Sequence, residues 1–228
     1  MKLKIVFLPD WIKNLYLRVI TPLIDFFIKR RLNPNHFTTI GLLLSVIAAF
    51  LFGSGFIRTA GIIMLLSGTF DIIDGKVARA TNRVTKFGAL YDSTLDRYAE
   101  VMIFFGLAYY FVNNHWTTGS INFSFINWTI HDINLSLIVT VAVCMALGGS
   151  VMTSYVRARA EGLGLECKVG VMQRPERIVF IAFGAIFHRI ALVIAIIIVA
   201  IFANITAIQR LYHVWITEKV KRTKLISE

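Results

Sequence analysis

Residues 71–97, DIIDGKVARATNRVTKFGALYDSTLDR, place four aspartates, five basic residues and two glycines in the middle of an otherwise apolar chain. Of the 228 residues, 57% are hydrophobic and only 16% are charged, which exceeds the apolar content of a soluble domain. We therefore predict an all-α, polytopic membrane protein. An ionised aspartate at the centre of a membrane helix costs about 2.5–3.5 kcal/mol on insertion scales, so four of them together indicate a function.

The spacing of the four aspartates predicts a metal site. Asp71 and Asp74 are three residues apart and Asp92 and Asp96 are four apart, so each pair lies on one face of a helix. If the short basic segment between the pairs is a turn, the two faces can meet. Carboxylate oxygens suit hard divalent cations, Mg²⁺ or Mn²⁺, and two such ions would suit phosphoryl chemistry.

The basic residues of that turn leave two interpretations open. Arg79, Arg83 and Lys86 could receive a phosphate at the edge of the metal site. Alternatively, they could only neutralise the aspartates in a structural cluster of salt bridges. Gly75 and Gly88 keep the two helices slim, which favours a site that a ligand approaches closely.

Six apolar windows are long enough, or nearly so, to cross a bilayer, because about 20 helical residues span a hydrocarbon core of about 30 Å. They are residues 37–57, 58–82, 86–113, 133–156, 174–187 and 190–208. We predict a single domain, residues 1–228, with an interfacial amphipathic helix at 9–32, a six-helix transmembrane bundle at 36–217 and a basic cytoplasmic tail at 218–228. Apolar residues recur every three or four positions from Trp11 onward, which is typical of an interfacial helix, although a plain extension of the first span is the alternative.

The net charge of +11 is unevenly distributed between the predicted loops. Basic residues gather in the N-terminal segment, in loops 76–86 and 157–177 and in the tail, whereas Arg58 and Arg189 are the only ones on the other side. The positive-inside rule then places both termini and the aspartates on the cytoplasmic side. Charges held at a membrane surface favour anionic lipids and substrates over nucleic acid. Gly148, Gly149 and Ser150 could allow close helix packing, within one chain or in a homodimer.

The quoted stretch resembles the signature of the CDP-alcohol phosphotransferases, D-x2-D-G-x2-A-R-x8-G-x3-D-x3-D. Every fixed position of the signature is present here: Asp71, Asp74, Gly75, Ala78, Arg79, Gly88, Asp92 and Asp96. The resemblance implies an integral membrane enzyme, in a bacterial cytoplasmic membrane, that uses two metal ions to displace CMP from CDP-diacylglycerol by an alcohol.

The resemblance also implies roles for individual residues. It makes Asp71, Asp74, Asp92 and Asp96 metal ligands, with Asp96 also acting as the catalytic base. The residues that it assigns to the CDP-lipid are Asn35, Thr38, Asp74, Gly75, Ala78, Arg79, Thr85 and Gly88. For Asn35 and Thr38, which precede the first predicted span, capping of a helix start is an equally open interpretation.

Three further segments, SYVRARAEGLG, QRPERIVF and IQRLYHVW, resemble parts of the bacterial phosphatidylinositol phosphate synthases, the branch of the family whose acceptor is inositol phosphate. The matching candidates for the acceptor phosphate are Arg157 (or Arg159), Arg174, Arg177 and Arg210. Forked guanidinium groups suit a phosphate dianion. The alternative is that these arginines only mark the cytoplasmic face.

Two other functions remain open from the sequence. Glycerol phosphate is also anionic, so a phosphatidylglycerophosphate synthase is the second candidate, although DSTLDR departs from the DPLADK-like context typical of that branch. Serine is a less favoured acceptor. A cation transporter with an intramembrane carboxylate site is conceivable, but it would explain neither the glycines nor Arg79 of the signature.

Overall fold

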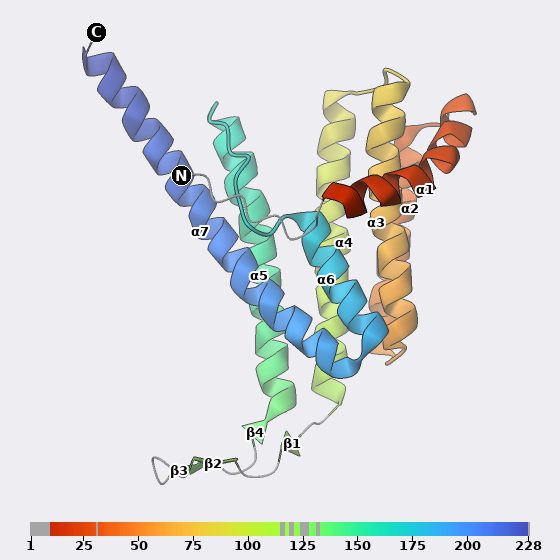
Figure 1. The fold of residues 1–228 in the computed structure, drawn as a ribbon, viewed down its shortest axis with the longest axis vertical. Helices are drawn as coiled ribbons and strands as arrows, with labels where there is room; N and C mark the ends of the chain where they lie inside the picture. Colours follow the sequence, from red (N-terminus) through yellow and green to blue (C-terminus); the bar gives the residue numbers. More distant parts are fainter. Residues whose placement is uncertain are drawn as a thin grey trace.

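The computed structural model describes residues 10–30, 32–114, 117–118, 121–123, 128–130 and 133–227. Three positions of the predicted segments lie outside the described residues. They are residue 9, where the interfacial helix was predicted to begin, residue 31 near its predicted end, and residue 228 at the predicted end of the tail. Six helices form an elongated bundle and a seventh, α1, lies against its side (Figure 1). Their bounds are α1 Asp10–Lys29, α2 Pro34–Gly53, α3 Ile57–Ala80, α4 Lys86–Asn113, α5 Leu135–Gly162, α6 Arg174–Phe187 and α7 Arg189–Ser227. The predicted all-α class is thus confirmed for the part of the chain that forms these helices.

Helices α2, α3 and α4 form one side of the bundle. Asn33 caps α2 by accepting a hydrogen bond from the Asn35 N–H at 3.2 Å, and Thr85 caps α4 by accepting one from the Gly88 N–H at 2.9 Å. Between α2 and α3 the chain reverses at Gly55, whose φ of +85° favours glycine. This turn ends α2 at Gly53, although the apolar window of the sequence continues to residue 57.

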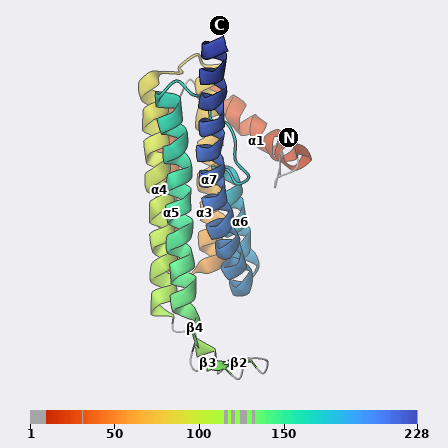
Figure 2. The same ribbon diagram turned by 90° about the vertical axis from the view of Figure 1, so that its left-hand side faces the viewer.

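Helices α5, α6 and α7 form the other side, and α6 also contacts α3 (Figure 2). The connector before α5 contains two short antiparallel ladders, β1 Thr117–Thr118 with β4 Ile133–Asn134 and β2 Ile121–Phe123 with β3 Trp128–Ile130. Ile133 and Asn134 therefore belong to a strand and not to the fourth predicted span. α7 continues without a break past residue 217 to Ser227, so the predicted tail is largely an extension of this helix.

Close approaches between backbones hold the bundle together. A Cβ at Gly106 of α4 would overlap the backbone of Ala49 in α2, and one at Gly149 of α5 would lie 2.8 Å from the Asn204 N in α7. The glycine at position 149 therefore serves packing inside the monomer. Buried side chains of α2 to α7, among them Phe52, Leu107 and Ile196, form one continuous core.

Helix α1 runs obliquely to the bundle in both views (Figures 1 and 2). Ile20 and Ile24 pack with Ile73 and Val77 of α3 in a second, smaller core. In contrast, Trp11 and Val19 of the predicted apolar stripe are 67% and 71% exposed. The helix is therefore held by one apolar edge while another apolar edge remains open.

Within the described residues, three helices are long and apolar enough to cross a membrane by length and composition: α2, α5 and the Arg189–Val220 part of α7. Large apolar side chains cover the outside of the bundle, including Phe50 and Phe105, which are 74% and 58% exposed. Apolar surface of this extent is typical of a protein surrounded by lipid. These observations support an integral membrane protein.

Candidate active site

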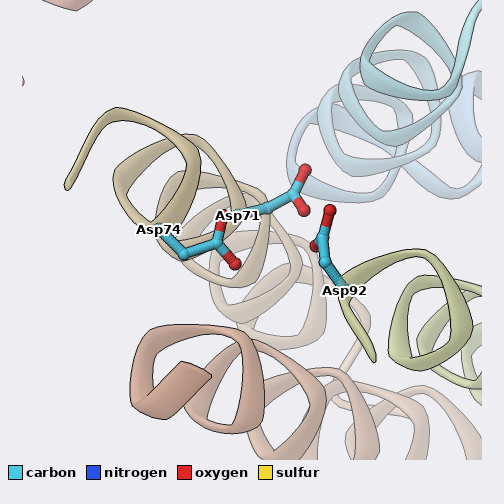
Figure 3. Close-up of side chains that lie close together, drawn as sticks. All are labelled: Asp71, Asp74 and Asp92. Atoms are coloured by element: carbon cyan, nitrogen blue, oxygen red, sulfur yellow. The ribbon is translucent and has the colours of Figure 1, made fainter. Parts of the chain in front are cut away.

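Three carboxylates converge between α3 and α4, near the turn that joins these helices. Asp71 and Asp74 project from α3 and Asp92 from α4, and one oxygen of each lies within 4.8 Å of the others (Figure 3). The carboxylates of Asp71 and Asp92 point toward one another across the gap between the helices. The predicted meeting of the two aspartate faces is therefore present in the structure.

Thr38, at the beginning of α2, orients one of these carboxylates. Its hydroxyl donates a hydrogen bond of 2.7 Å to Asp74 Oδ2, and both side chains are buried. The cap of α2 is Asn33, so neither Asn35 nor Thr38 has the capping role that the sequence left open. A fixed donor favours one rotamer of the carboxylate, which prepares its other oxygen for a ligand.

The fourth aspartate joins the cluster through an arginine. Arg174, the first residue of α6, bonds Asp71 Oδ2 through Nη1 and Asp96 Oδ1 through Nη2, each at 2.7 Å. Among the described residues, the ion pairs of Asp71 and Asp96 thus involve Arg174 and, at 3.9 Å, Arg97. In this part of the chain they come from α6 and α4 and not from Arg79 or Lys86, which disfavours the salt-bridge cluster that the sequence left open.

A cavity of about 250 Å³ opens on one side of the aspartates, between the beginning of α2, the end of α3 and the beginning of α4. All eight residues predicted to bind the CDP-lipid line it, namely Asn35, Thr38, Asp74, Gly75, Ala78, Arg79, Thr85 and Gly88. Arg79 folds back over its own helix, where its guanidinium would lie 3.3 Å from a Cβ at Gly75. Any side chain at position 75 would thus compete with this arginine for space.

A larger cavity of about 810 Å³ opens on the other side of the aspartates, between α4, α5, α6 and α7. The four arginines predicted to bind the acceptor phosphate line it: Arg157, Arg174, Arg177 and Arg210. Arg159, the alternative to Arg157, does not. Asp92 lines both this cavity and the smaller one, and Asp96 lines this one. The two cavities therefore meet at the aspartates.

Each of the four predicted acceptor arginines also contacts the protein itself. Arg177 donates from Nε to Glu100 Oε1 at 2.9 Å, and Arg157 does the same to Glu161 Oε1 at 2.9 Å. Arg210 donates to two backbone carbonyls, those of Val169 at 2.8 Å and Thr153 at 2.6 Å. Through these two hydrogen bonds Arg210 connects α7 to α5 and to the loop before α6. Arg210 therefore also stabilises the packing of these elements.

Glu100 and Arg97 are two residues of the site that the sequence patterns missed. Glu100 follows Asp96 by four residues on the same face of α4, and it is buried with Arg177 one turn into α6. Its four-residue spacing after Asp96 was the available signal. Arg97, which directly follows Asp96, lines the larger cavity. Both residues were missed because the family signature ends at Asp96 and therefore does not include them.

The aspartate cluster fits a divalent cation. Its ligand atoms are all carboxylate oxygens, the donors that Mg²⁺ and Mn²⁺ prefer. Asp92 Oδ1 is buried and has no hydrogen-bond partner among the described residues, as expected for an oxygen reserved for a ligand. Asp71, Asp74 and Asp92 would hold the ion, whose charge would offset that of a bound diphosphate.

Relatives of known name share most of the chain. Archaetidylinositol phosphate synthase of Methanothermobacter thermautotrophicus is 34% identical over 202 residues, which are 87% of this chain and 89% of that protein. Phosphatidylinositol phosphate synthase of Mycobacteroides abscessus is 33% identical over 176 residues, 77% of this chain and 71% of that protein.

Solved structures of the Mycobacterium tuberculosis phosphatidylinositol phosphate synthase have the same fold. The structure with CDP-DAG bound has a TM-score of 0.69 at 29% identity and covers 87% of this chain and 94% of the other. The structure with manganese and citrate has a TM-score of 0.70 at 28% identity and covers 86% and 88%. The family model described as CDP-alcohol phosphatidyltransferase matches residues 31–217. With the family signature at the meeting point of two cavities, the chain belongs to the CDP-alcohol phosphatidyltransferase family.

Proposed function

We propose that the enzyme transfers a phosphatidyl group from CDP-diacylglycerol to a hydroxyl of inositol phosphate and releases CMP. The observation that carries this proposal is the pair of cavities that meet at Asp92. One is lined by the residues expected to bind the CDP-lipid and the other by five arginines. A donor and a phosphorylated acceptor bound in these cavities would approach each other at the aspartates.

The smaller cavity is the proposed site of the CDP group. Gly75, Ala78 and Gly88 have small or absent side chains, which lets a nucleotide approach the α3 and α4 backbones. Arg79 would pair with the diphosphate. Asp71, Asp74, Asp92 and Asp96 are the proposed ligands of two Mg²⁺ or Mn²⁺ ions. These ions would neutralise the diphosphate and stabilise the leaving CMP.

Asp96 is the proposed general base. It lines the larger cavity, and its Oδ1 accepts a bond of 2.7 Å from the Arg174 guanidinium, which holds the carboxylate in place. In the reaction, the acceptor oxygen forms a bond to the lipid-bearing phosphorus and the bond from that phosphorus to the CMP oxygen breaks. Asp96 takes the hydroxyl proton, and CMP leaves with the electron pair.

The arginines of the larger cavity support a phosphorylated acceptor over a neutral one. Five guanidinium groups line it against three carboxylates, and a neutral alcohol would add no anionic partner for the arginines in excess. Inositol phosphate is favoured because the relatives reported above are an archaetidylinositol phosphate synthase and phosphatidylinositol phosphate synthases. Glycerol phosphate is the second candidate on the same charge argument.

We further propose that all six helices from α2 to α7 span the membrane and that α1 lies in the interface. The open apolar edge of α1, with Trp11 and Val19, would contact lipid while Ile20 and Ile24 hold the bundle. Both termini and the aspartates would face the cytoplasm, with a homodimer as a further prediction. A C-terminal reporter that is active only outside the cell would refute this orientation.

An acceptor screen tests the proposed function. Purified protein with Mn²⁺ or Mg²⁺ and CDP-diacylglycerol should release CMP with inositol phosphate, but poorly with glycerol phosphate, serine or free inositol. Asp92→Asn is the inactive control. CDP-archaeol serves as a second donor, because one named relative is an archaetidyl enzyme. Efficient use of glycerol phosphate with no use of inositol phosphate would replace the first candidate acceptor by the second.

A further inference from the structure

We propose that Arg97 is a substrate-binding residue that contacts the acceptor phosphate and selects phosphorylated over free alcohols. The inference rests on the proposed function and names a residue outside the family signature. Its basis is the position of Arg97 in the larger cavity together with the contacts of the other arginines there.

Arg97 is placed to reach an acceptor that is in contact with Asp96. It follows Asp96 directly on α4, and both side chains line the larger cavity, with 30% and 15% of their side-chain surface exposed. An acceptor whose hydroxyl lies at Asp96 therefore brings its substituents within the range of this guanidinium. Arg157 and Arg210, in contrast, enter the same cavity from α5 and α7.

Arg97 is the arginine of this cavity with the weakest hold on the protein. Arg157, Arg174 and Arg177 each bond a carboxylate at 2.7–2.9 Å, and Arg210 bonds two carbonyls. Within the described part of the chain, the ion pair of Arg97 joins its Nη2 to Asp96 Oδ2 at 3.9 Å, too long for a hydrogen bond. Its Nε is buried and has no hydrogen-bond partner among the described residues. A half-buried guanidinium with this few bonds calls for an anionic partner.

The charges of the cavity match a phosphate dianion. Five arginines line it against three carboxylates, which are Asp92, Asp96 and Glu161. Among the residues that line the cavity the arginines thus exceed the carboxylates by two, while Asp71 and Glu100, which lie outside the lining, bond Arg174 and Arg177. A phosphate monoester carries about −1.5 to −2 at neutral pH. The other four arginines are each held by bonds of 2.6–2.9 Å, whereas Arg97 can turn its whole guanidinium toward a ligand without losing a bond of that kind.

The competing role for Arg97 is to position Asp96 through their 3.9 Å ion pair. The two roles predict different kinetics. A contact to the acceptor phosphate changes the acceptor KM and is irrelevant to an acceptor without phosphate. A positioning role lowers kcat for every acceptor, because the base is affected whichever alcohol is bound.

The experiment compares Arg97→Gln, Arg97→Lys and native enzyme, assayed by CMP release with inositol phosphate and with free inositol. Arg97→Gln should raise the inositol phosphate KM about ten- to hundredfold, the range for a charge-assisted contact, and leave the CDP-diacylglycerol KM unchanged. Arg97→Lys should recover part of the loss, because the charge remains but the fork does not. The weak activity with free inositol should be the same in all three. Arg58→Gln, at an exposed arginine near the beginning of α3, is the matched control and should behave like native enzyme.

A binding measurement keeps the test independent of catalysis. Inositol phosphate should raise the melting temperature of native and Arg58→Gln enzyme but not of Arg97→Gln, because only a bound ligand stabilises the fold. An unchanged acceptor KM, a fall in kcat alone, or equal thermal stabilisation of Arg97→Gln would overturn the assignment. If native enzyme uses glycerol phosphate instead, the proposed acceptor fails, and Arg97 is then tested with glycerol phosphate against glycerol.

Discussion

The buried ion pair between Glu100 and Arg177 allows the sharpest test of the structure. The two side chains meet at 2.9 Å between α4 and α6, and they are only 8% and 2% exposed. Glu100 Oε2 and Arg177 Nη1 have no further hydrogen-bond partner among the described residues, so each charge depends mainly on the other. Glu100→Leu would leave the Arg177 guanidinium buried without its carboxylate.

We expect Glu100→Leu to destabilise the protein by about 3–5 kcal/mol, the range for removing one partner of a buried pair. At roughly 2–4 °C per kcal/mol for a chain of this size, the apparent melting temperature in detergent should fall by roughly 6–20 °C. The double variant Glu100→Leu with Arg177→Met should recover most of the loss, because apolar residues often replace a buried pair without cost. Tryptophan fluorescence during a thermal ramp measures the apparent melting temperature of each of these variants.

The matched control is Glu166→Gln, which removes the carboxylate of an exposed ion pair with Lys168. Both of these side chains are mostly exposed, so the change should stay within about 1 kcal/mol. If Glu100→Leu melts no lower than Glu166→Gln, or if the double variant is less stable than either single variant, the ion pair between Glu100 and Arg177 does not stabilise the fold in the way argued above. The double variant also isolates Arg177, since a raised acceptor KM in a stable protein would show that this arginine contacts the acceptor as well.

Three further outcomes follow from named contacts. Thr38→Val should lower kcat/KM about tenfold at limiting Mn²⁺, with partial recovery in excess Mn²⁺, because a carboxylate ligand loses its orienting hydrogen bond; a loss equal at all Mn²⁺ concentrations would contradict this. Gly106→Ala should destabilise the protein by about 1–3 kcal/mol, because the new Cβ would overlap the α2 backbone. Gly148→Ala should leave the melting temperature unchanged in the same assay, because a Cβ at position 148 would have no neighbouring atom within 4 Å. Asp92→Asn should abolish both Mn²⁺-dependent nucleotide binding and turnover, whereas Asp96→Asn should lose most turnover but still bind CDP-lipid; equal loss of binding would remove the separate role of Asp96.

The helices were predictable where local signals were strong. α4 and α6 begin and end at the predicted residues, because Thr85 caps the first and Gln173, Glu176 and an early proline begin the second. α7 was predicted too short, since the apolar window ends at residue 208 while the helix continues through polar and basic residues that no proline or glycine interrupts. Hydropathy locates the part of a helix that contacts lipid, and a helix can extend beyond it.

The metal cluster was predictable for a different reason. Spacings of three and four residues place side chains on one helix face, and a short turn forces two such faces together. No spacing rule connects Arg174 with Asp71, which are 103 residues apart, or Arg177 with Glu100, which are 77 apart. These pairs depend on how α6 packs against α3 and on how α2 holds α3 and α4 together, and that packing is set by apolar contacts distributed over several helices.

Arg174 shows why individual residues of this site cannot be assigned to one substrate alone. Its guanidinium bonds Asp71 in the metal cluster and Asp96, the proposed base, and it also lines the acceptor cavity. A carboxylate bonded to a guanidinium has less electron density to offer a cation, so the same group tempers the metal site and holds the base. One turn later, Arg177 repeats the arrangement with Glu100, which fixes the direction of α6 and thereby the position of Arg174. Loss of Arg174 would therefore alter metal affinity, base position and acceptor binding together. Among the described residues, Arg97 has one distant ion pair, with Asp96, and none with Asp71, Asp74 or Asp92, so it is the arginine from which the acceptor contribution can best be measured separately.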